Sequence, residues 1–211
     1  MMANISDRVL VIANGEIPSS EVVNNLLQNC DFIVACDGGL NHCNKLEIIP
    51  DLLCGDFDSI DSDLSEGLNS EFTNVIQMQN QDKSDLSKAL SYLRDEGFTS
   101  IDVIGIEGGR LDHQFGVWSC LIESDSYASL HYEDFVLKRV PNDTIQLQTK
   151  LGKIVSLHAI TPCKGVSLAG CKFTLNHDTL EIGTRGIHNL AQAETIEVSK
   201  VSGELLVMIE R

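Results

Sequence analysis

The sequence predicts two domains of different class: an α/β N-terminal domain with a mostly parallel sheet in residues 1–125, and an all-β C-terminal sandwich domain in residues 126–211. In the first part, short apolar runs alternate with helix-like segments, as parallel α/β units do. In the second part, short strand-like runs are separated by turn residues, which is typical of antiparallel sheets. At 211 residues, the chain is long enough to build a core in each part.

The first domain is expected to begin with a strand over residues 8–13 and a helix over residues 20–28, which starts behind Pro-Ser-Ser. The clearest helix covers residues 84–96 and ends at Gly97. Its apolar stripe has the spacing i, i+3, i+4, i+7 and consists of Leu86, Ala89, Leu90 and Leu93. The remaining elements are strands over residues 31–36, 48–54, 74–78 and 101–106, and a helix over residues 114–123.

The second domain is expected to contain strands only. Its strand-like runs are SLHYE, DFVLKRV, TIQLQTK, KIVSLHAI, GVSLAG, KFTLNH, TLEIG, ETIEVSK and GELLVMIE. These runs predict an antiparallel sandwich but not the order of its strands.

The cysteines and the apolar stretches limit the class of protein. The seven cysteines are odd in number, include no Cys-x-x-Cys pair and mostly lie in apolar surroundings, so neither disulfides nor a zinc site are expected. No apolar stretch is long enough to span a membrane, and the start MMANISDRV does not resemble a secretory signal. We therefore expect a cytoplasmic protein with no membrane partner.

The net charge of −16, from 31 acidic and 15 basic residues, limits the partners. A field of this sign repels a phosphate backbone, so no nucleic-acid partner is expected. A small polyphosphate can bind such a protein only where metal ions and a few local basic groups reverse the field.

Polar clusters follow the carboxyl ends of four successive predicted strands: Asp37-Gly38-Gly39, Gly55-Asp56-Phe57-Asp58-Ser59, Gln81-Asp82-Lys83-Ser84-Asp85 and Gly108-Gly109-Arg110-Leu111-Asp112-His113. In an open parallel sheet, ligands bind outside those ends. The four segments are therefore predicted to converge on one site.

The cluster around Asp56 and Asp58 predicts a magnesium site. Residues i and i+2 of an extended loop project to the same side, so both carboxylates can face one cation. Mg²⁺ is commonly held by one or two carboxylates together with substrate phosphates and water. The alternative is an acidic turn in which Asp58 or Ser59 caps a helix, but the three companion clusters favour the metal.

Two of the remaining clusters leave more than one role open. Asp82 and Asp85 stand at the entrance of the predicted 84–96 helix, where either could cap the helix or complement its dipole. Gly108-Gly109-Arg110 can bring backbone amides and a guanidinium to a polyphosphate, or can form a turn in which Arg110 pairs with Asp112. The segment matches neither the dinucleotide fingerprint nor a P-loop.

Taken in order, the segments CDGGLN, GDFDSI, NQDKSDLSKAL and GGRLDH resemble the thiamine pyrophosphokinase family. The resemblance covers most of the first domain, and the pair GDFDS and QDxSDLxKAL is highly specific. It implies an α/β nucleotide domain, a β-sandwich domain, a homodimer, and thiamine bound where two subunits meet. It also implies transfer of the diphosphate of ATP to thiamine, with Mg²⁺ as cofactor and AMP as the second product.

The resemblance also implies roles for individual residues. The expected catalytic carboxylates are Asp37, Asp56, Asp58 and Asp85, of which Asp56, Asp58 and Asp85 bind the metal. The expected ATP-binding residues are Asn41, Arg110 and Asp112. The expected thiamine-binding residues are Gln81, Asp82, Phe173, His188 and Asn189.

Two segments of the second domain depart from the family pattern. The stretch Gly186-Ile187-His188-Asn189 has His where the family usually has Ser, and Lys172-Phe173-Thr174-Leu175 has Phe where Trp is common. Both departures lie in segments that are expected to contact thiamine.

Two alternative functions stay open on the sequence alone. A haloacid-dehalogenase-like phosphatase would use an Asp-x-Asp pair as nucleophile and acid, although it leaves the QDKSD and GGRLDH clusters unexplained. A non-catalytic sensor of thiamine or nucleotides would use the same fold for binding without turnover.

Overall fold

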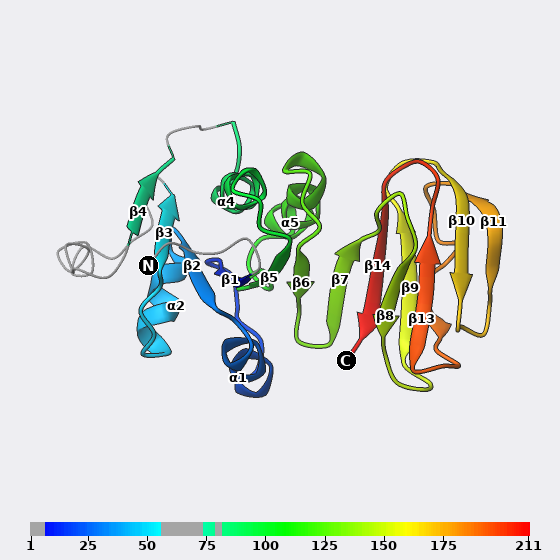
Figure 1. Cartoon of the computed structure of the whole chain (residues 1–211), viewed down its shortest axis with the longest axis horizontal. Coiled ribbons are helices and arrows are strands. Elements are labelled where there is room, and N and C mark those ends of the chain that lie inside the picture. Colours follow the sequence, from blue (N-terminus) through cyan, green and yellow to red (C-terminus); the bar gives the residue numbers. More distant parts are fainter. Residues whose placement is uncertain (1–6, 56–73, 79–81) are drawn as a thin grey trace. The chain divides into compact units, whose positions relative to one another are not determined.

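The computed structural model describes residues 7–55, 74–78 and 82–211 and divides into two compact units, Met1–Glu133 and Asp134–Arg211 (Figure 1). The first unit is α/β and the second is an antiparallel β-sandwich, which confirms the predicted fold class. None of the described helices is both long and apolar enough to cross a bilayer.

The first unit contains a parallel sheet with the strand order β6-β5-β1-β2-β3-β4. Its strands are β1 (Arg8–Ile12), β2 (Phe32–Cys36), β3 (Leu52–Gly55), β4 (Asn74–Gln77), β5 (Ser100–Ile104) and β6 (Ser129–His131). The chain runs outward from β1 through β2, β3 and β4, and then returns to place β5 on the other side of β1. The sheet therefore has its topological switch point between β1 and β5.

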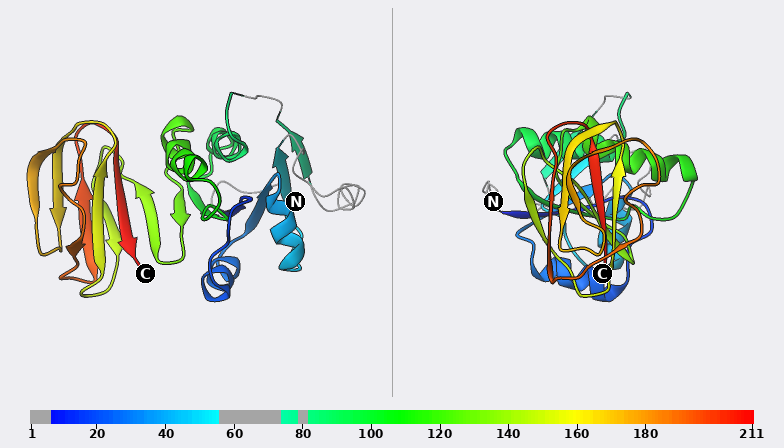
Figure 2. Two further views of the ribbon diagram at one scale, coloured as in Figure 1. Left: turned by 180° about the vertical axis from the view of Figure 1, so that it is seen from behind. Right: turned by 90° about the vertical axis from the view of Figure 1, so that its right-hand side faces the viewer.

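In the described part of the unit, four helices cover the two faces of this sheet: α1 (Ser20–Gln28), α2 (Gly39–Lys45), α4 (Asp85–Asp95) and α5 (Leu111–Glu123). Figures 1 and 2 show α1 and α2 on one face and α4 and α5 on the other. The stripe predicted for residues 84–96 is buried along α4, because Leu86, Ala89, Leu90 and Leu93 are each at most 7% exposed.

One strand expected in the second domain belongs to the parallel sheet instead. The run SLHYE contains β6, whose Ser129 and Leu130 pair in parallel with Asp102 and Val103 of β5. The division between the units accordingly falls after Glu133 rather than near residue 125. A three-residue strand carries too short a pattern to reveal the direction of its neighbour.

Helix α2 was missed by the sequence analysis, because its start at Gly38-Gly39 gives a poor helix signal. The structure explains both glycines by close packing against the end of β1. A Cβ atom on Gly38 would lie 2.3 Å from Cγ of Asn14, and one on Gly39 would lie 2.0 Å from the Ile12 carbonyl oxygen. Only glycine lets the backbone of this loop approach β1 so closely.

We therefore expect Gly39→Ala to destabilise the protein by about 1–3 kcal/mol, as overpacking of a tight core does. The matched control is Gly116→Ala, because Gly116 lies inside α5 and a Cβ there would meet nothing within 4 Å. This second change should stabilise the protein by about 0.5–1 kcal/mol through helix propensity. Denaturant unfolding of the two variants checks both signs, and a stabilised Gly39→Ala would contradict the packing described for α2.

The second unit packs two antiparallel sheets face to face, with strand orders β12-β9-β14-β7 and β11-β10-β13-β8. Its strands are β7 (Phe135–Arg139), β8 (Ile145–Gln148), β9 (Ile154–Ala159), β10 (Cys163–Ala169), β11 (Leu175–Leu180), β12 (Asn189–Leu190), β13 (Thr195–Ser199) and β14 (Leu205–Glu210). Its core is formed by alternate apolar residues of both sheets, among them Leu157, Val166, Val198 and Val207.

The runs KFTLNH and TLEIG, expected as separate strands, form the single strand β11. His177 in its middle has a left-handed backbone with φ of 55°, and the register with β10 shifts between Leu175 and Asp178, the stretch that contains His177. This bulge explains the break in the sequence pattern, because an extra residue in one strand interrupts the alternation of faces.

Candidate functional site

A cavity of about 500 Å³ lies in the first unit at the carboxyl ends of its strands. Asn14 and Gly15, which follow β1, line one part of it, and Gly108 and Arg110, which follow β5, line another. The cavity therefore lies at the switch point between β1 and β5, where open α/β sheets bind their ligands. Four of the predicted site residues line it: Asp37, Asp85, Arg110 and Asp112.

Asp37 is the buried carboxylate of this cavity. It follows β2 directly, is 5% exposed and has a left-handed backbone with φ of 43°. Its backbone N–H donates to the Cys54 carbonyl oxygen at 2.8 Å, which ties the turn after β2 to strand β3. Its Oδ1 atom accepts no hydrogen bond from the residues that the structure describes. A buried carboxylate oxygen of this kind is costly unless a ligand or cation completes its environment.

Asp85 lies at the first position of α4, where a negative charge interacts favourably with the helix dipole. The N-cap itself is Ser84, whose Oγ accepts the N–H of Ser87 at 3.2 Å, so neither Asp82 nor Asp85 caps this helix. Because Ser84 caps the N-terminus of α4, the Asp85 carboxylate does not serve as the cap and lines the cavity instead.

The glycine-rich loop after β5 presents Arg110 to the cavity. Gly108 and Gly109 have φ of 72° and 66°, which other residues rarely adopt. The Arg110 side chain is 75% exposed and binds the carboxylate of Asp112 through its Nε and Nη2 atoms, at 3.0 and 2.6 Å. The hydrogen bonds between them raise the pKa of Arg110 and lower the pKa of Asp112. The structure therefore contains the turn in which Arg110 pairs with Asp112, and this turn lies at the edge of the cavity.

Cys36 also lines the cavity, beside Asp37. Its Sγ lies 3.8 Å from Sγ of Cys54 on the neighbouring strand, and all seven cysteines are free thiols. The hydrogen bond with Cys54 and burial raise the pKa of Cys36 well above its usual value. Cys36 is therefore a protonated packing residue at neutral pH and not a nucleophile.

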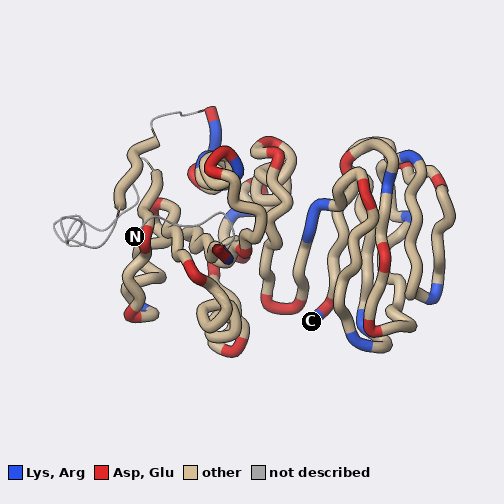
Figure 3. The backbone as a smooth tube through the Cα atoms, viewed as in Figure 1, with Lys and Arg blue, Asp and Glu red and all other residues tan. Residues whose placement is uncertain are grey.

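Charge is distributed very unevenly between the two units (Figure 3). Residues 1–133 contain 23 of the 31 acidic residues but only six of the 15 basic ones. Those six are Arg8, Lys45, Lys83, Lys88, Arg94 and Arg110. A polyphosphate entering the cavity meets Arg110 in a strongly acidic surrounding, so its binding requires further positive charge.

The carboxylates that line the cavity suit Mg²⁺, and this ion would supply the further positive charge that a polyphosphate requires. Asp37 and Asp85 supply the hard oxygen ligands that this ion prefers, and one or two carboxylates together with phosphates suffice to hold it. Among the described residues, no three His, Cys, Asp or Glu side chains already converge on one metal position. Asp56 and Asp58, the other two expected carboxylates, lie outside the described residues, as does Gln81.

Some site residues were not identified from the sequence, and some identified residues do not line the cavity. Asn14 and Gly15 were missed, although they follow β1 in the same way that the four recognised clusters follow their strands. Asn41 on α2 and the exposed Asp82 are not among the residues that line the cavity. Gln114 was also missed; its side chain donates to the Gly108 carbonyl oxygen at 3.0 Å and holds the glycine loop.

In the second unit, Asn189 fixes the loop that displays Phe173. Asn189 is 5% exposed; its Nδ2 donates to the Phe173 carbonyl oxygen at 2.6 Å, and its Oδ1 accepts the Phe173 N–H at 3.0 Å. Phe173 is 64% exposed, and Nζ of Lys172 lies 5.4 Å from the centroid of its ring. The exposed aromatic face is therefore held in place through its backbone.

His188 immediately precedes Asn189 in the chain, and its side chain is exposed. Its backbone is left-handed with φ of 58°, and its N–H donates to Oγ of Ser156 at 3.0 Å. Asn189 thus holds the backbone of Phe173 next to the segment that carries His188, and both of these residues are exposed.

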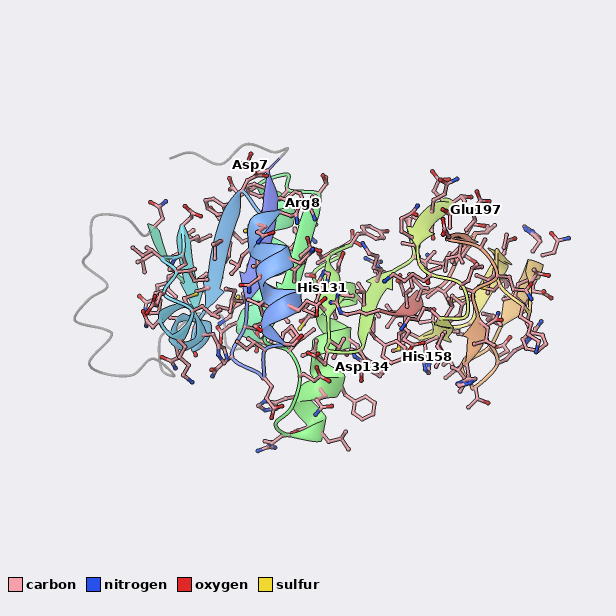
Figure 4. All side chains as sticks on the ribbon, turned by 90° about the horizontal axis from the view of Figure 1, so that it is seen from below. Asp7, Arg8, His131, Asp134, His158 and Glu197 are labelled. Atoms are coloured by element: carbon pink, nitrogen blue, oxygen red, sulfur yellow. The ribbon has the colours of Figure 1, made fainter. Side chains whose placement is uncertain are left out.

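A polar cluster of Arg8, Asp102 and His131 lies outside the cavity lining; Arg8 and His131 are labelled in Figure 4. Asp102 on β5 accepts from Nε2 of His131 at 2.7 Å, and Nη2 of Arg8 lies 3.5 Å from its other oxygen. None of the three residues lines the cavity, and Arg8 is at the opposite end of β1. This cluster joins β1, β5 and β6 and is structural.

Two family models match the chain. The thiamin pyrophosphokinase catalytic domain matches residues 23–130, and the thiamin pyrophosphokinase vitamin B1 binding domain matches residues 142–205. Thiamin pyrophosphokinase 1 of Caenorhabditis elegans is 29% identical over 220 residues, covering 96% of this chain and 88% of that protein. These matches support neither the phosphatase nor the sensor alternative.

Solved structures with similar folds include two thiamin pyrophosphokinases. The Bacillus subtilis protein superposes with a TM-score of 0.81 at 23% identity, covering 96% of this chain and 98% of its own. The Candida albicans protein superposes with a TM-score of 0.79 at 18% identity, covering 98% of this chain and 90% of its own. Together, the two family models span most of the sequence, and the chain belongs to the thiamin pyrophosphokinase family.

Proposed function

We propose that this protein transfers the diphosphate of ATP to the hydroxyethyl group of thiamine, giving thiamine diphosphate and AMP, in the cytoplasm. The observation that carries this proposal is the cavity at the β1/β5 switch point, where Asp37, Asp85 and Arg110 come together. A carboxylate pair beside a guanidinium suits a polyphosphate bound with a divalent cation. Membership of the thiamin pyrophosphokinase family identifies the acceptor.

The carboxylates are proposed to hold Mg²⁺. Asp85 would act together with Asp56 and Asp58 as metal ligands, and Asp37 would complete the acidic catalytic site. When bound, the ion neutralises charge on the phosphates of ATP during transfer. Asp37 supports this assignment most directly, because one oxygen of its buried carboxylate is left without a hydrogen bond from the described residues.

ATP is proposed to be held by Arg110, Asp112 and Asn41. Arg110 offers paired donors to phosphate oxygens, and its contact with Asp112 keeps the guanidinium at the rim of the cavity. Asn41 does not line the cavity; its proposed role is supported by the buried oxygen of its amide, which has no hydrogen-bond partner among the described residues.

Thiamine is proposed to bind between Gln81 and Asp82 of one chain and Phe173, His188 and Asn189 of a second copy, in a homodimer. Family membership and the exposure of Phe173 and His188 in the second unit support this assignment. The first unit would then supply the ATP and magnesium site, and the second unit the thiamine-binding and dimerisation surface.

The proposed chemistry is in-line attack of the thiamine hydroxyl oxygen on the β-phosphorus of ATP. The new O–P bond forms as the bond from the β-phosphorus to the AMP oxygen breaks, and AMP leaves. Asp85 or a neighbouring carboxylate would accept the hydroxyl proton. The chain contributes chiefly by positioning the two substrates and by placing Arg110 where negative charge develops.

Incubation with ATP, Mg²⁺ and thiamine should yield AMP and thiamine diphosphate in equal amounts, because the acceptor is placed beside the β-phosphate. Chromatographic separation of the products checks this ratio. Formation of ADP and thiamine monophosphate would reject diphosphoryl transfer, and tight binding of thiamine without turnover would identify a sensor instead.

A further inference from the structure

Lys88 is a buried cation that pairs with Asp85 but does not itself line the cavity. It belongs to the specific stretch QDKSDLSKAL and lies one turn into α4. Its side chain is 7% exposed, although lysine is almost never fully buried without a partner. In a unit with only six basic residues, one of them is thus enclosed beside the acidic site.

Two contacts account for the burial of Lys88. Its Nζ lies 2.5 Å from Oδ1 of Asp85, three residues earlier on the same helix. The same Nζ donates to the carbonyl oxygen of Met78 at 3.1 Å, just beyond the end of β4. Lys88 therefore connects the carboxylate that lines the cavity to the end of a strand.

This connection fixes two parts of the site at once. Asp85 is 29% exposed at its side chain, so without Lys88 its carboxylate could turn toward solvent. A buried ammonium that pairs with a carboxylate and a carbonyl has little freedom of its own, because each lost contact leaves a desolvated charge. Lys88 does not line the cavity, so its influence on a ligand passes through Asp85.

We propose that Lys88 is a positioning residue that holds the Asp85 carboxylate at the cavity wall, oriented for the magnesium–nucleotide complex. The proposal rests on the function proposed above for this site. It adds to that function a residue that does not line the cavity. It also implies that the contribution of Asp85 to nucleotide binding depends on Lys88.

A double-mutant cycle tests the proposal, with Lys88→Met, Asp85→Asn and the combined variant. Calorimetry measures binding of Mg²⁺ with a non-hydrolysable ATP analogue, which requires neither thiamine nor turnover. Lys88→Met is expected to weaken binding about tenfold in the wild-type background and to have almost no effect in the Asp85→Asn background. Lys45→Met, at an exposed lysine on α2, removes the same charge and should change binding less than about twofold in both backgrounds.

The kinetic constants and folding of the same proteins complete the test. Lys88→Met should lower kcat and leave the KM for thiamine nearly unchanged, and Lys88→Arg, which keeps the charge, should recover most nucleotide affinity.

If Lys88→Met weakens nucleotide binding by the same factor with and without Asp85, Lys88 is merely structural and the proposal fails. If Lys88→Met does not fold, equal nucleotide affinity of Lys88→Arg and Lys88→Gln overturns the proposal, since only Arg keeps the charge. Absence of thiamine diphosphate from the wild-type reaction would instead reject the proposed function, whatever the cycle shows.

Discussion

Asp37→Asn is expected to reduce diphosphoryl transfer at least about a hundredfold while leaving the fold intact. Asparagine has the same shape and, like aspartate, tolerates the left-handed backbone found at this position. The variant keeps the packing of a residue that is 5% exposed and removes only its charge. Without nucleotide, its thermal unfolding midpoint should be unchanged or higher, because a buried charge has been replaced by a neutral amide.

Steady-state rates over a range of Mg²⁺ concentrations check this expectation, with Asp95→Asn as the control. Asp95 lies at the end of α4 with its side chain 65% exposed and does not line the cavity. The control should retain near-normal rates. Asp56→Asn and Asp58→Asn should lose activity in the same way as Asp37→Asn. Near-normal rates of all three variants at limiting Mg²⁺ would show that the acidic site is wrongly assigned.

Mixing two inactive variants is expected to restore about a quarter of wild-type activity, if each active site is shared between two chains. Asp37→Asn damages the cavity of the first unit, and Asn189→Ala releases the Phe173 backbone in the second unit. Each homodimer should therefore be severely impaired. After co-refolding of equal amounts, half of the dimers are mixed, and one of the two sites in each mixed dimer contains only unaltered residues.

The matched control mixes Asp37→Asn with Asp85→Asn, which both lie in the first unit and should recover no activity. Native mass spectrometry establishes that mixed dimers form. Phe173→Ala is the second choice for the C-terminal variant, because its exposed ring contributes little to folding. Mixed dimers of the first pair that remain inactive would confine the site to one chain.

The regular elements of the first unit could be predicted because their periodic patterns are long. The buried stripe of α4 and the apolar runs of β1 and β2 are examples. Helix α2 and the parallel pairing of β6 could not be predicted, since their patterns are short and depend on tertiary contacts. Gly39 illustrates this point: in the sequence it reads as a turn residue, but the structure requires it because the Ile12 carbonyl oxygen lies so close.

The candidate site was predictable to the extent that it depends on chain topology. Asp37, Asp85 and Arg110 follow strand ends, and the parallel sheet brings these ends together. Hydrogen bonds between distant segments could not be predicted from the sequence. Asn189 was expected to bind thiamine, but only the structure shows that its side chain forms hydrogen bonds with the backbone of Phe173. The contact of Lys88 with Met78 is hidden in the same way, because ten residues separate them in the chain.

The fate of the individual phosphorus atoms of ATP shows which of its phosphoanhydride bonds is broken. With ATP labelled separately at the α-, β- or γ-phosphorus, the β and γ labels should both appear in the thiamine product in equal amounts, and the α label should remain in AMP. This result follows if the hydroxyl of thiamine attacks the β-phosphorus. Transfer of the γ label alone, with the β label retained in ADP, would rule out diphosphoryl transfer.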